Sequence, residues 1–195
     1  MKLTLVRHGR PDEDHADRPH DPPLCAEGRR QAEAVASLLS AEGVTHIVAS
    51  PLARAHETAL PLAGRLGLAV RTVDGWAEAD RHVARYRSTE TLRAQGDDEW
   101  RRFLDDPVRY LGGDPAAFQA AVLGALQATV DAPADAHIAV FTHGLPINVV
   151  LSHVLGLGAI VHFRPGYGSL TRLAARDGRL GVVSVNERTH HPLHT

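Results

Sequence analysis

The chain is short of several features that mark particular classes of protein. It has one cysteine, Cys25, so no intramolecular disulfide can form, as is usual in a reducing compartment. No window approaches the roughly 18 uncharged apolar residues of a membrane-spanning helix. The apolar run at residues 3–6 is too short for the core of a signal peptide. We therefore expect a soluble, cytoplasmic protein with no membrane partner.

An excess of charge of either sign is also missing. The formal net charge is −2, and Lys2 is the only lysine among basic residues that are otherwise arginine. This balance gives no general attraction to nucleic acid. The 195 residues, 44% of them hydrophobic and 23% charged, are enough for one well-packed globular domain. We expect residues 1–195 to form a single domain with no nucleic-acid partner.

Three short, continuously apolar runs share a plan. They cover residues 3–6, 45–50 and 137–142. Each is typical of a strand that is covered on both faces. Pro51 and Pro146 follow the second and third runs near the first position of a helical pattern, where proline is favoured. Ser50 is a plausible N-cap for the helix after the second run.

The rest of the chain continues this alternation with one interruption. A helix is expected at about 26–41, and further strands at 69–74, 169–175 and 178–186. Residues 88–131 contain two helical patterns in succession, which predicts a helical insertion at about 80–135. Strands that alternate with helices predict an α/β fold with a mostly parallel sheet.

Polar residues follow the predicted strands at the places where ligands gather. Ligands of an open α/β sheet bind outside the carboxyl ends of its strands. Arg7, His8 and His143 directly follow strands, and Arg54 lies in the first turn of a helix that follows Ser50. The helix N-terminus adds free N–H groups and a favourable dipole. Two guanidiniums and two imidazoles in one crevice predict a phosphate or a similar oxyanion as the ligand.

Five segments resemble the motifs of one known family in the expected order. They are LVRHG, LCAEGRRQAEAVASLL, VASPLARAHETA, THGLPINVVLSHVLGL and SVNERTHH. The chain is similar to the histidine phosphatase superfamily, which includes phosphoglycerate mutase, although Cys25 stands where that family usually has threonine. The resemblance implies a three-layer sandwich with helices on both faces of the sheet and a helical insertion near the active-site crevice.

The resemblance also implies the roles of the site residues. His8 would attack phosphorus and form a phosphohistidine, while Arg7, Arg54 and His143 would hold the phosphate oxygens, without a cofactor or a metal. A neutral imidazole is a competent nucleophile near neutral pH. Its other nitrogen should donate to a backbone carbonyl, which fixes the tautomer. Gly9 is expected to let the backbone turn closely beside the anion.

Three further assignments around the phosphate are less direct. The leaving alcohol needs a proton, and VDGWAEADRH offers two carboxylic acids, Glu78 and Asp80. Glu78 aligns better with the family's Leu-x-Glu position, and the site must raise its pKa. Arg10 replaces the glutamate or glutamine that often follows the family's Arg-His-Gly, and it either adds a cation to the pocket or faces solvent. Gly144, next to the second histidine, is expected to contribute to phosphate binding.

The sequence favours a phosphatase over a mutase. RHGRPDEDH lacks the tryptophan and asparagine that follow Arg-His-Gly in the family's phosphoglycerate mutases. We expect hydrolysis of a small-molecule phosphomonoester, with a mutase or a non-catalytic phospholigand-binding protein as alternatives. The substrate is open, and so is the oligomeric state, with a homodimer among the options.

Two other readings compete for the remaining polar residues. Acidic and histidine residues that could suit zinc or manganese occur in a loop (Asp12, Asp14, His15, Asp17, His20 and Asp21) and near the C-terminus (His190, His191 and His194). Neither group has the spacing of a strong metal motif, so we expect no metal site. Cys25 lies where a helix should begin, which favours a small residue at a helix entry over a catalytic cysteine. The arginines at 81, 85, 87, 93, 101, 102 and 109 are expected to be mostly solvated, although some could read the rest of the substrate.

Overall fold

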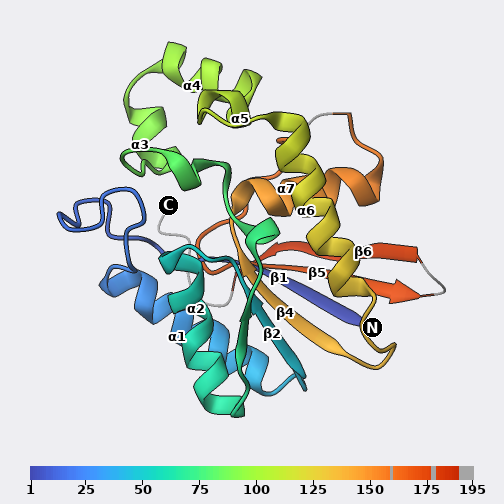
Figure 1. Ribbon diagram of the computed structural model, residues 1–195. Coiled ribbons are helices and arrows are strands. Elements are labelled where there is room, and N and C mark those ends of the chain that lie inside the picture. The colour runs from blue at the N-terminus through green and yellow to red at the C-terminus, as the bar shows by residue number, and fades with distance from the viewer. Residues whose placement is uncertain (159, 177–178, 189–195) are drawn as a thin grey trace.

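The computed structural model describes residues 1–158, 160–176 and 179–188, and a six-stranded sheet forms its centre (Figure 1). The strands are β1 (Lys2–Arg7), β2 (His46–Ala49), β3 (Val70–Thr72), β4 (His137–Thr142), β5 (Leu170–Arg176) and β6 (Arg179–Glu187). Their order is β3-β2-β4-β1-β5-β6. The first four are parallel, while β5 and β6 form an antiparallel hairpin at one edge. The predicted mostly parallel sheet is confirmed.

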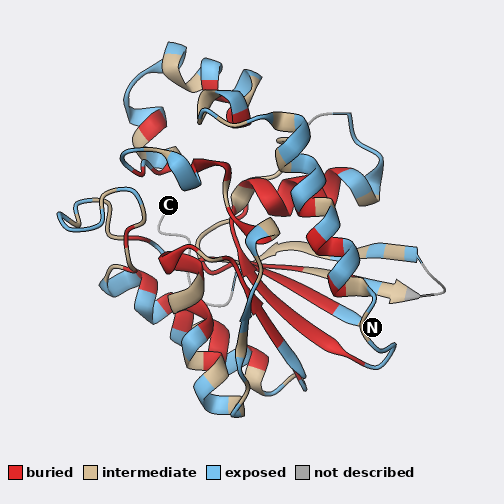
Figure 2. Cartoon of the chain, in the orientation of Figure 1, coloured by how far each residue is buried: buried red, intermediate tan, exposed pale blue. Residues whose placement is uncertain are grey.

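Helices cover both faces of the sheet, which gives the three layers (Figure 1). The helices α1 (Ala26–Ser40) and α2 (Ala53–Leu66) cover one face, and α6 (Pro115–Val130) and α7 (Gly144–Leu155) cover the other. Side chains of β1 alternate between the two layers. Leu3 and Leu5 pack in the core cluster that includes α6 and α7, whereas Val6 packs in the cluster of α1 and α2. The central strands are buried on both sides (Figure 2), as their continuously apolar sequences predict.

The structure divides the expected insertion at 80–135 into two parts. Two short 3₁₀ helices, η1 (Asp74–Trp76) and η2 (Ala79–His82), precede α3 (Thr89–Ala94), α4 (Asp97–Asp105) and α5 (Pro107–Tyr110) beyond one end of the sheet. Helix α6 instead packs on the sheet, where Val122, Ala125 and Leu126 join the central core. Its sequence is apolar almost all round, so the sequence pattern did not reveal which face would be buried. Among the described residues, no helix is long and apolar enough to span a membrane.

The start of α2 differs from the prediction for Ser50. The helix begins at Ala53, and the N-cap residue Leu52 makes no side-chain capping bond. The N–H of Ala53 donates to both carboxylate oxygens of Asp21, at 2.9 and 3.1 Å. The Ser50 hydroxyl accepts from the N–H of Leu52 at 3.2 Å, before the helix begins. The prediction of Ser50 as the N-cap was wrong, because a carboxylate from the loop between β1 and α1 takes that role.

A glycine–glycine contact sets how the chain leaves β1. Cys25 stands at the entry of α1, as predicted, and its Sγ caps the helix by accepting from the N–H of Gly28 at 3.5 Å. A Cβ on Gly9 would lie 2.5 Å from the carbonyl oxygen of Gly28, and a Cβ on Gly28 would lie 2.1 Å from that of Arg10. Gly9 has no left-handed φ. The structure therefore gives a different reason for Gly9 from the predicted turn beside an anion, namely close packing against the first turn of α1.

This contact predicts opposite effects for two Gly-to-Ala substitutions. Gly28→Ala should lower the free energy of unfolding by about 1–3 kcal/mol, because the new methyl group must push backbone aside. Gly124→Ala is the matched control in α6, where an added Cβ meets nothing within 4 Å. It should raise the free energy of unfolding by about 0.5–1 kcal/mol, since alanine is the better helix former. Urea unfolding of the two variants measures both changes, and a shift of the same sign in both would contradict the packing argument.

Candidate active site

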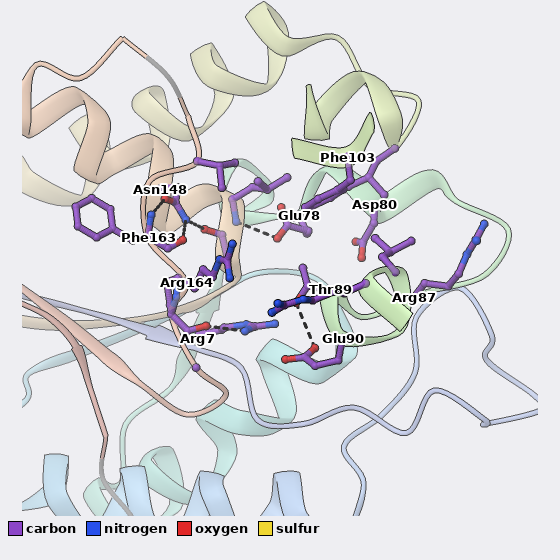
Figure 3. A pocket seen from close by; sticks show the side chains of 18 of the residues that line it. Arg7, Glu78, Asp80, Arg87, Thr89, Glu90, Phe103, Asn148, Phe163 and Arg164 are labelled. Atoms are coloured by element: carbon purple, nitrogen blue, oxygen red, sulfur yellow. Dashed lines mark hydrogen bonds between the residues drawn. The ribbon is translucent and has the colours of Figure 1, made fainter. Parts of the chain in front are cut away.

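The carboxyl ends of β1, β2 and β4 meet beside one cavity. The cavity has a volume of about 290 Å³ and extends from the end of the sheet to α3, α4 and the start of α7. Of the residues predicted for the site, those on its wall are Arg7, His8, Arg54, Glu78, Asp80 and Gly144. Figure 3 shows Glu78 and Asp80 on one side of the cavity and Arg7 on the other. The fold thus gathers most of the predicted site around one space.

His8 is held as a neutral imidazole with one nitrogen left for chemistry. Its side chain is buried, and Nδ1 donates to the carbonyl oxygen of Gly9 at 2.7 Å. Since a carbonyl only accepts, the hydrogen is on Nδ1 and the lone pair is on Nε2, which confirms the predicted tautomer. Burial, together with the positive charges of Arg54 and Arg7, places the pKa of His8 well below its ordinary value. Nε2 is therefore unprotonated near neutral pH.

Arg54 is a fully buried cation with unused donors. Its Nη2 donates to both oxygens of Asp80, at 2.7 and 2.9 Å, and its guanidinium lies 4.5 Å from the ring centre of Tyr86. Burial alone would lower the pKa of Arg54, but the Asp80 carboxylate raises it, so the charge is kept. Within the described residues, Nε and Nη1 have no hydrogen-bond partner, and Nη1 lies 3.8 Å from a carboxylate oxygen of Asp21. Two nitrogens, with three N–H groups between them, are left to bind an anion.

Arg7 lines the same cavity and is also held in place. Its Nη1 donates to the carbonyl oxygen of Pro165 at 2.6 Å, and its guanidinium lies 4.1 Å from the ring centre of Tyr167. The buried Nε finds no partner in the part of the chain that the structure describes. The ring of Tyr167 also lies 5.5 Å from that of His8. The second guanidinium is thus held rigidly beside the nucleophilic imidazole, again with a donor to spare.

His143 lies next to His8 but does not line the cavity. The two rings are 5.0 Å apart, and Nε2 of His143 shares a hydrogen bond of 2.7 Å with the hydroxyl of Ser50. Its Nδ1 is buried and has no hydrogen-bond partner among residues 1–158, 160–176 and 179–188. Burial and the nearby Arg54 charge lower the pKa of His143 well below its ordinary value. When the Ser50 hydroxyl donates to Nε2, the ring hydrogen of the neutral imidazole is on Nδ1.

The structure separates the two candidate acids by their partners. Glu78 accepts from its neighbour, the N–H of Ala79, at 3.0 Å and from the N–H of Leu145 at 3.1 Å. Burial, and next the negative charge of Asp80, raise the pKa of Glu78 to about 7. Asp80 is engaged by Arg54 through both of its oxygens. This geometry makes Glu78 the better proton donor and makes Asp80 the residue that orients Arg54.

The remaining predicted residues fall into three groups. Gly144 lines the cavity as the first residue of α7. The exposed side chain of Arg10 pairs with Glu27 at 3.0 Å and does not line the cavity, so it faces solvent. Of the metal candidates, Asp21 caps α2, and His190, His191 and His194 lie outside the described residues. Across the described ranges, no group of three or more His, Cys, Asp or Glu side chains is placed to hold a metal ion.

The sequence did not point to Asn148, whose side chain connects two segments of the cavity wall. Its Nδ2 donates to the carbonyl oxygens of Gly144 and Phe163, at 2.9 and 3.0 Å, while Oδ1 accepts from the N–H of Phe163 at 2.9 Å (Figure 3). This side chain fixes the loop after α7 to the first turn of that helix. The available signal was a single amide inside the otherwise apolar helix LPINVVL. Buried amides of this kind need partners, so their position indicates a structural contact.

Comparisons with known proteins agree on a family and on a fold. The family model of the histidine phosphatase superfamily (branch 1) matches residues 3–188. The probable phosphoglycerate mutase GpmB of Yersinia enterocolitica is 32% identical over 165 residues, which cover 80% of this chain and 76% of that protein. The GpmB protein of Proteus mirabilis, with the same description, is 33% identical over 171 residues, 84% of this chain and 79% of its own.

Two solved structures show the same fold at lower sequence identity. A mycobacterial glucosyl-3-phosphoglycerate phosphatase, complexed with VO3, is 24% identical with a TM-score of 0.78 and covers 95% of this chain and 98% of its own. A phosphoserine phosphatase from Entamoeba histolytica, in complex with 3-phosphoglyceric acid, is 24% identical with a TM-score of 0.73 and covers 95% and 96%. Both likenesses extend over nearly the whole of each chain.

The negative charge of Asp80 beside Glu78 predicts how the pKa of Glu78 changes when that charge is removed. In Asp80→Asn the negative charge beside Glu78 is lost, so the pKa of Glu78 should fall from about 7 towards its ordinary value. Titration of the Glu78 side-chain carboxyl by ¹³C NMR measures this pKa in both proteins. Asp74→Asn, at an exposed carboxylate that does not line the cavity, is the control and should leave it unchanged. A Glu78 pKa that stays near 7 in Asp80→Asn would contradict the charge effect.

Proposed function

Since the chain belongs to the histidine phosphatase superfamily, we propose that it is a metal-independent phosphatase that hydrolyses a phosphomonoester through a phosphohistidine on His8. The observation that carries this proposal is the arrangement around His8. One imidazole nitrogen is tied to the carbonyl of Gly9, and the other is unprotonated beside guanidiniums that have unused donors. A phosphate dianion supplies acceptors for those donors, and its phosphorus is the electrophile that a neutral imidazole attacks.

In the first half of the reaction, the phosphoryl group moves to His8. The phosphate oxygens accept from Nε of Arg7 and from Nε and Nη1 of Arg54, which places phosphorus at Nε2 of His8. The new N–P bond forms as the P–O bond to the alcohol breaks. Protonated Glu78 gives its proton to the departing oxygen, so a neutral alcohol leaves. Catalysis rests on positioning and on fixed positive charge, and loss of one such donor typically costs about 10²–10³ in rate.

In the second half, water takes the place of the alcohol. The carboxylate of Glu78, now ionised, accepts a proton from water while the water oxygen attacks phosphorus. The N–P bond breaks, its electron pair returns to Nε2 of His8, and inorganic phosphate leaves. A pKa of about 7 suits both halves, because Glu78 then exchanges protons readily in either direction near neutral pH.

A phosphoglycerate mutase is the second candidate, and the names of the curated relatives favour it. A mutase uses the same phosphohistidine and differs in the acceptor, which is a second hydroxyl group instead of water. The residues after Gly9 favour the phosphatase, because they lack the tryptophan and asparagine that the family's mutases have at this place. Release of inorganic phosphate in the absence of any acceptor alcohol separates the two.

We expect His8→Ala to abolish phosphate release while the fold is kept. The measurement is phosphate release from a broad panel of phosphomonoesters with a chelator present, alongside circular dichroism of each variant. His153→Ala is the matched control, since His153 is an exposed histidine on α7 outside the cavity. It should retain full activity. More than a few per cent of residual activity in His8→Ala would exclude His8 as the nucleophile, and full loss on chelation would exclude the metal-free route.

Glu78→Gln should slow esters of poor leaving groups far more than esters of good ones. An alkoxide must be protonated as it leaves, whereas p-nitrophenolate is stable without protonation. Hydrolysis of alkyl phosphates should therefore slow about 10²-fold or more, and the burst of p-nitrophenolate should slow much less. In the unsubstituted protein, alkyl phosphate cleavage should decline as pH rises through about 7, because the acid form of Glu78 is lost. Stopped-flow and steady-state rates across pH test this. Equal slowing of both ester classes would assign Glu78 to binding instead.

A further inference from the structure

Beyond the phosphate position, the wall of the cavity is largely apolar. The side chains that form it come from α3, α4, the end of α5, α7 and the loop after α7. They are Leu92, Trp100, Phe103, Leu104, Leu111, Leu145, Val161 and Phe163. We call these residues the apolar wall. The rings of Trp100 and Phe103 are stacked, with centres 5.5 Å apart and planes at 20°, so part of the wall is flat.

The apolar wall starts directly beside the proposed proton donor. Leu145 donates its backbone N–H to Glu78 at 3.1 Å, and its own side chain lines the cavity. Figure 3 shows Phe103 on the same side of the cavity as Glu78. The oxygen that receives the proton from Glu78 belongs to the leaving group. The group attached to that oxygen therefore enters the space that the apolar wall surrounds.

Charged side chains also line the cavity beyond the phosphate position, Glu90 and four arginines, and the guanidinium of Arg164 lies 5.6 Å from the ring centre of Trp100. Arg87, Arg93, Arg164 and Arg188 are exposed, whereas Leu92, Phe103 and Leu145 are only 2%, 6% and 6% exposed. Exposed guanidiniums stay hydrated, and they attract a phosphate dianion over a distance that salt shortens. The most buried part of the wall, formed by Leu92, Phe103 and Leu145, carries no charge. A carboxylate there would lose its water without compensation.

We propose that the substrate is a phosphomonoester whose leaving group is an apolar alkyl or aryl body that packs against the apolar wall. This inference rests on the phosphatase function proposed above. The cavity volume of about 290 Å³ lies at the lower end of small-molecule pockets, which suits one ring or a short chain beside the phosphate. Recognition then comes from burial of apolar surface at the same site that performs the chemistry.

A series of n-alkyl phosphates tests this inference. Ethyl, butyl and hexyl phosphate have leaving groups of nearly equal basicity, so differences in kcat/KM report on contacts with the chain. A buried methylene is worth about 0.8 kcal/mol, which corresponds to about fourfold in kcat/KM for each methylene until the wall is filled. Glycerol 3-phosphate and 3-phosphoglycerate serve as polar and anionic comparisons, and both should be poorer substrates than hexyl phosphate.

Leu104→Asp places a charge on the apolar wall without disturbing the core, because Leu104 is 37% exposed. It should reduce kcat/KM for hexyl phosphate at least about tenfold and leave ethyl phosphate within about twofold. Leu60→Asp is the matched control, at a leucine on α2 that is 48% exposed and does not line the cavity, and it should change neither.

The outcomes separate this inference from the function on which it rests. Three results, each with phosphate still released, would overturn the inference about the leaving group and not the phosphatase function. They are equal kcat/KM values along the alkyl series, a higher kcat/KM for 3-phosphoglycerate than for hexyl phosphate, and an unchanged kcat/KM for hexyl phosphate in Leu104→Asp. No release from any of the five esters would overturn the phosphatase itself.

Discussion

The burial of one arginine, Arg54, is the constraint on which the site depends. A guanidinium removed from water is costly unless anions and hydrogen-bond acceptors surround it. Asp80 satisfies one of its nitrogens and leaves Nε and Nη1 without partners in the described part of the chain. The same charge lowers the pKa of His8 and His143. A dianion that enters the cavity therefore meets a cation that lacks acceptors and an imidazole that is already deprotonated.

The strand-end residues of the site were predictable from the sequence, because a parallel sheet brings the carboxyl ends of its strands to one edge. Arg7, His8, Arg54 and His143 follow strands or lie in the first turn after one, and the structure places all of them within this one site. The tautomer of His8 was predictable too, because a nucleophilic ring nitrogen must keep its lone pair. The other ring nitrogen then carries the hydrogen and needs an acceptor such as a backbone carbonyl. The strand order and the antiparallel pairing of β5 with β1 depend on contacts between distant segments, which local periodicity does not report.

Other features depended on contacts between segments that are far apart in the sequence. The cap of α2 comes from Asp21, 32 residues before Ala53, so the local signal at Ser50 was misleading. Gly9 is needed where the chain crosses the first turn of α1, and no local pattern reveals that crossing. The choice between Glu78 and Asp80 likewise required their partners. The sequence offered two carboxylates in one turn, and only the position of Arg54 assigns them different tasks.

The central claim is that His8 carries the phosphoryl group and passes it to water. The most direct measurement is a single-turnover reaction with a ³²P-labelled phosphomonoester, quenched in alkali, followed by mass spectrometry of the peptide that contains His8 and by separation of the labelled products. We expect a transient phosphoryl group on His8 that decays to inorganic phosphate without any added alcohol. Inorganic phosphate formed with no label ever on His8, or a label that leaves His8 only when an acceptor alcohol is supplied, would contradict it.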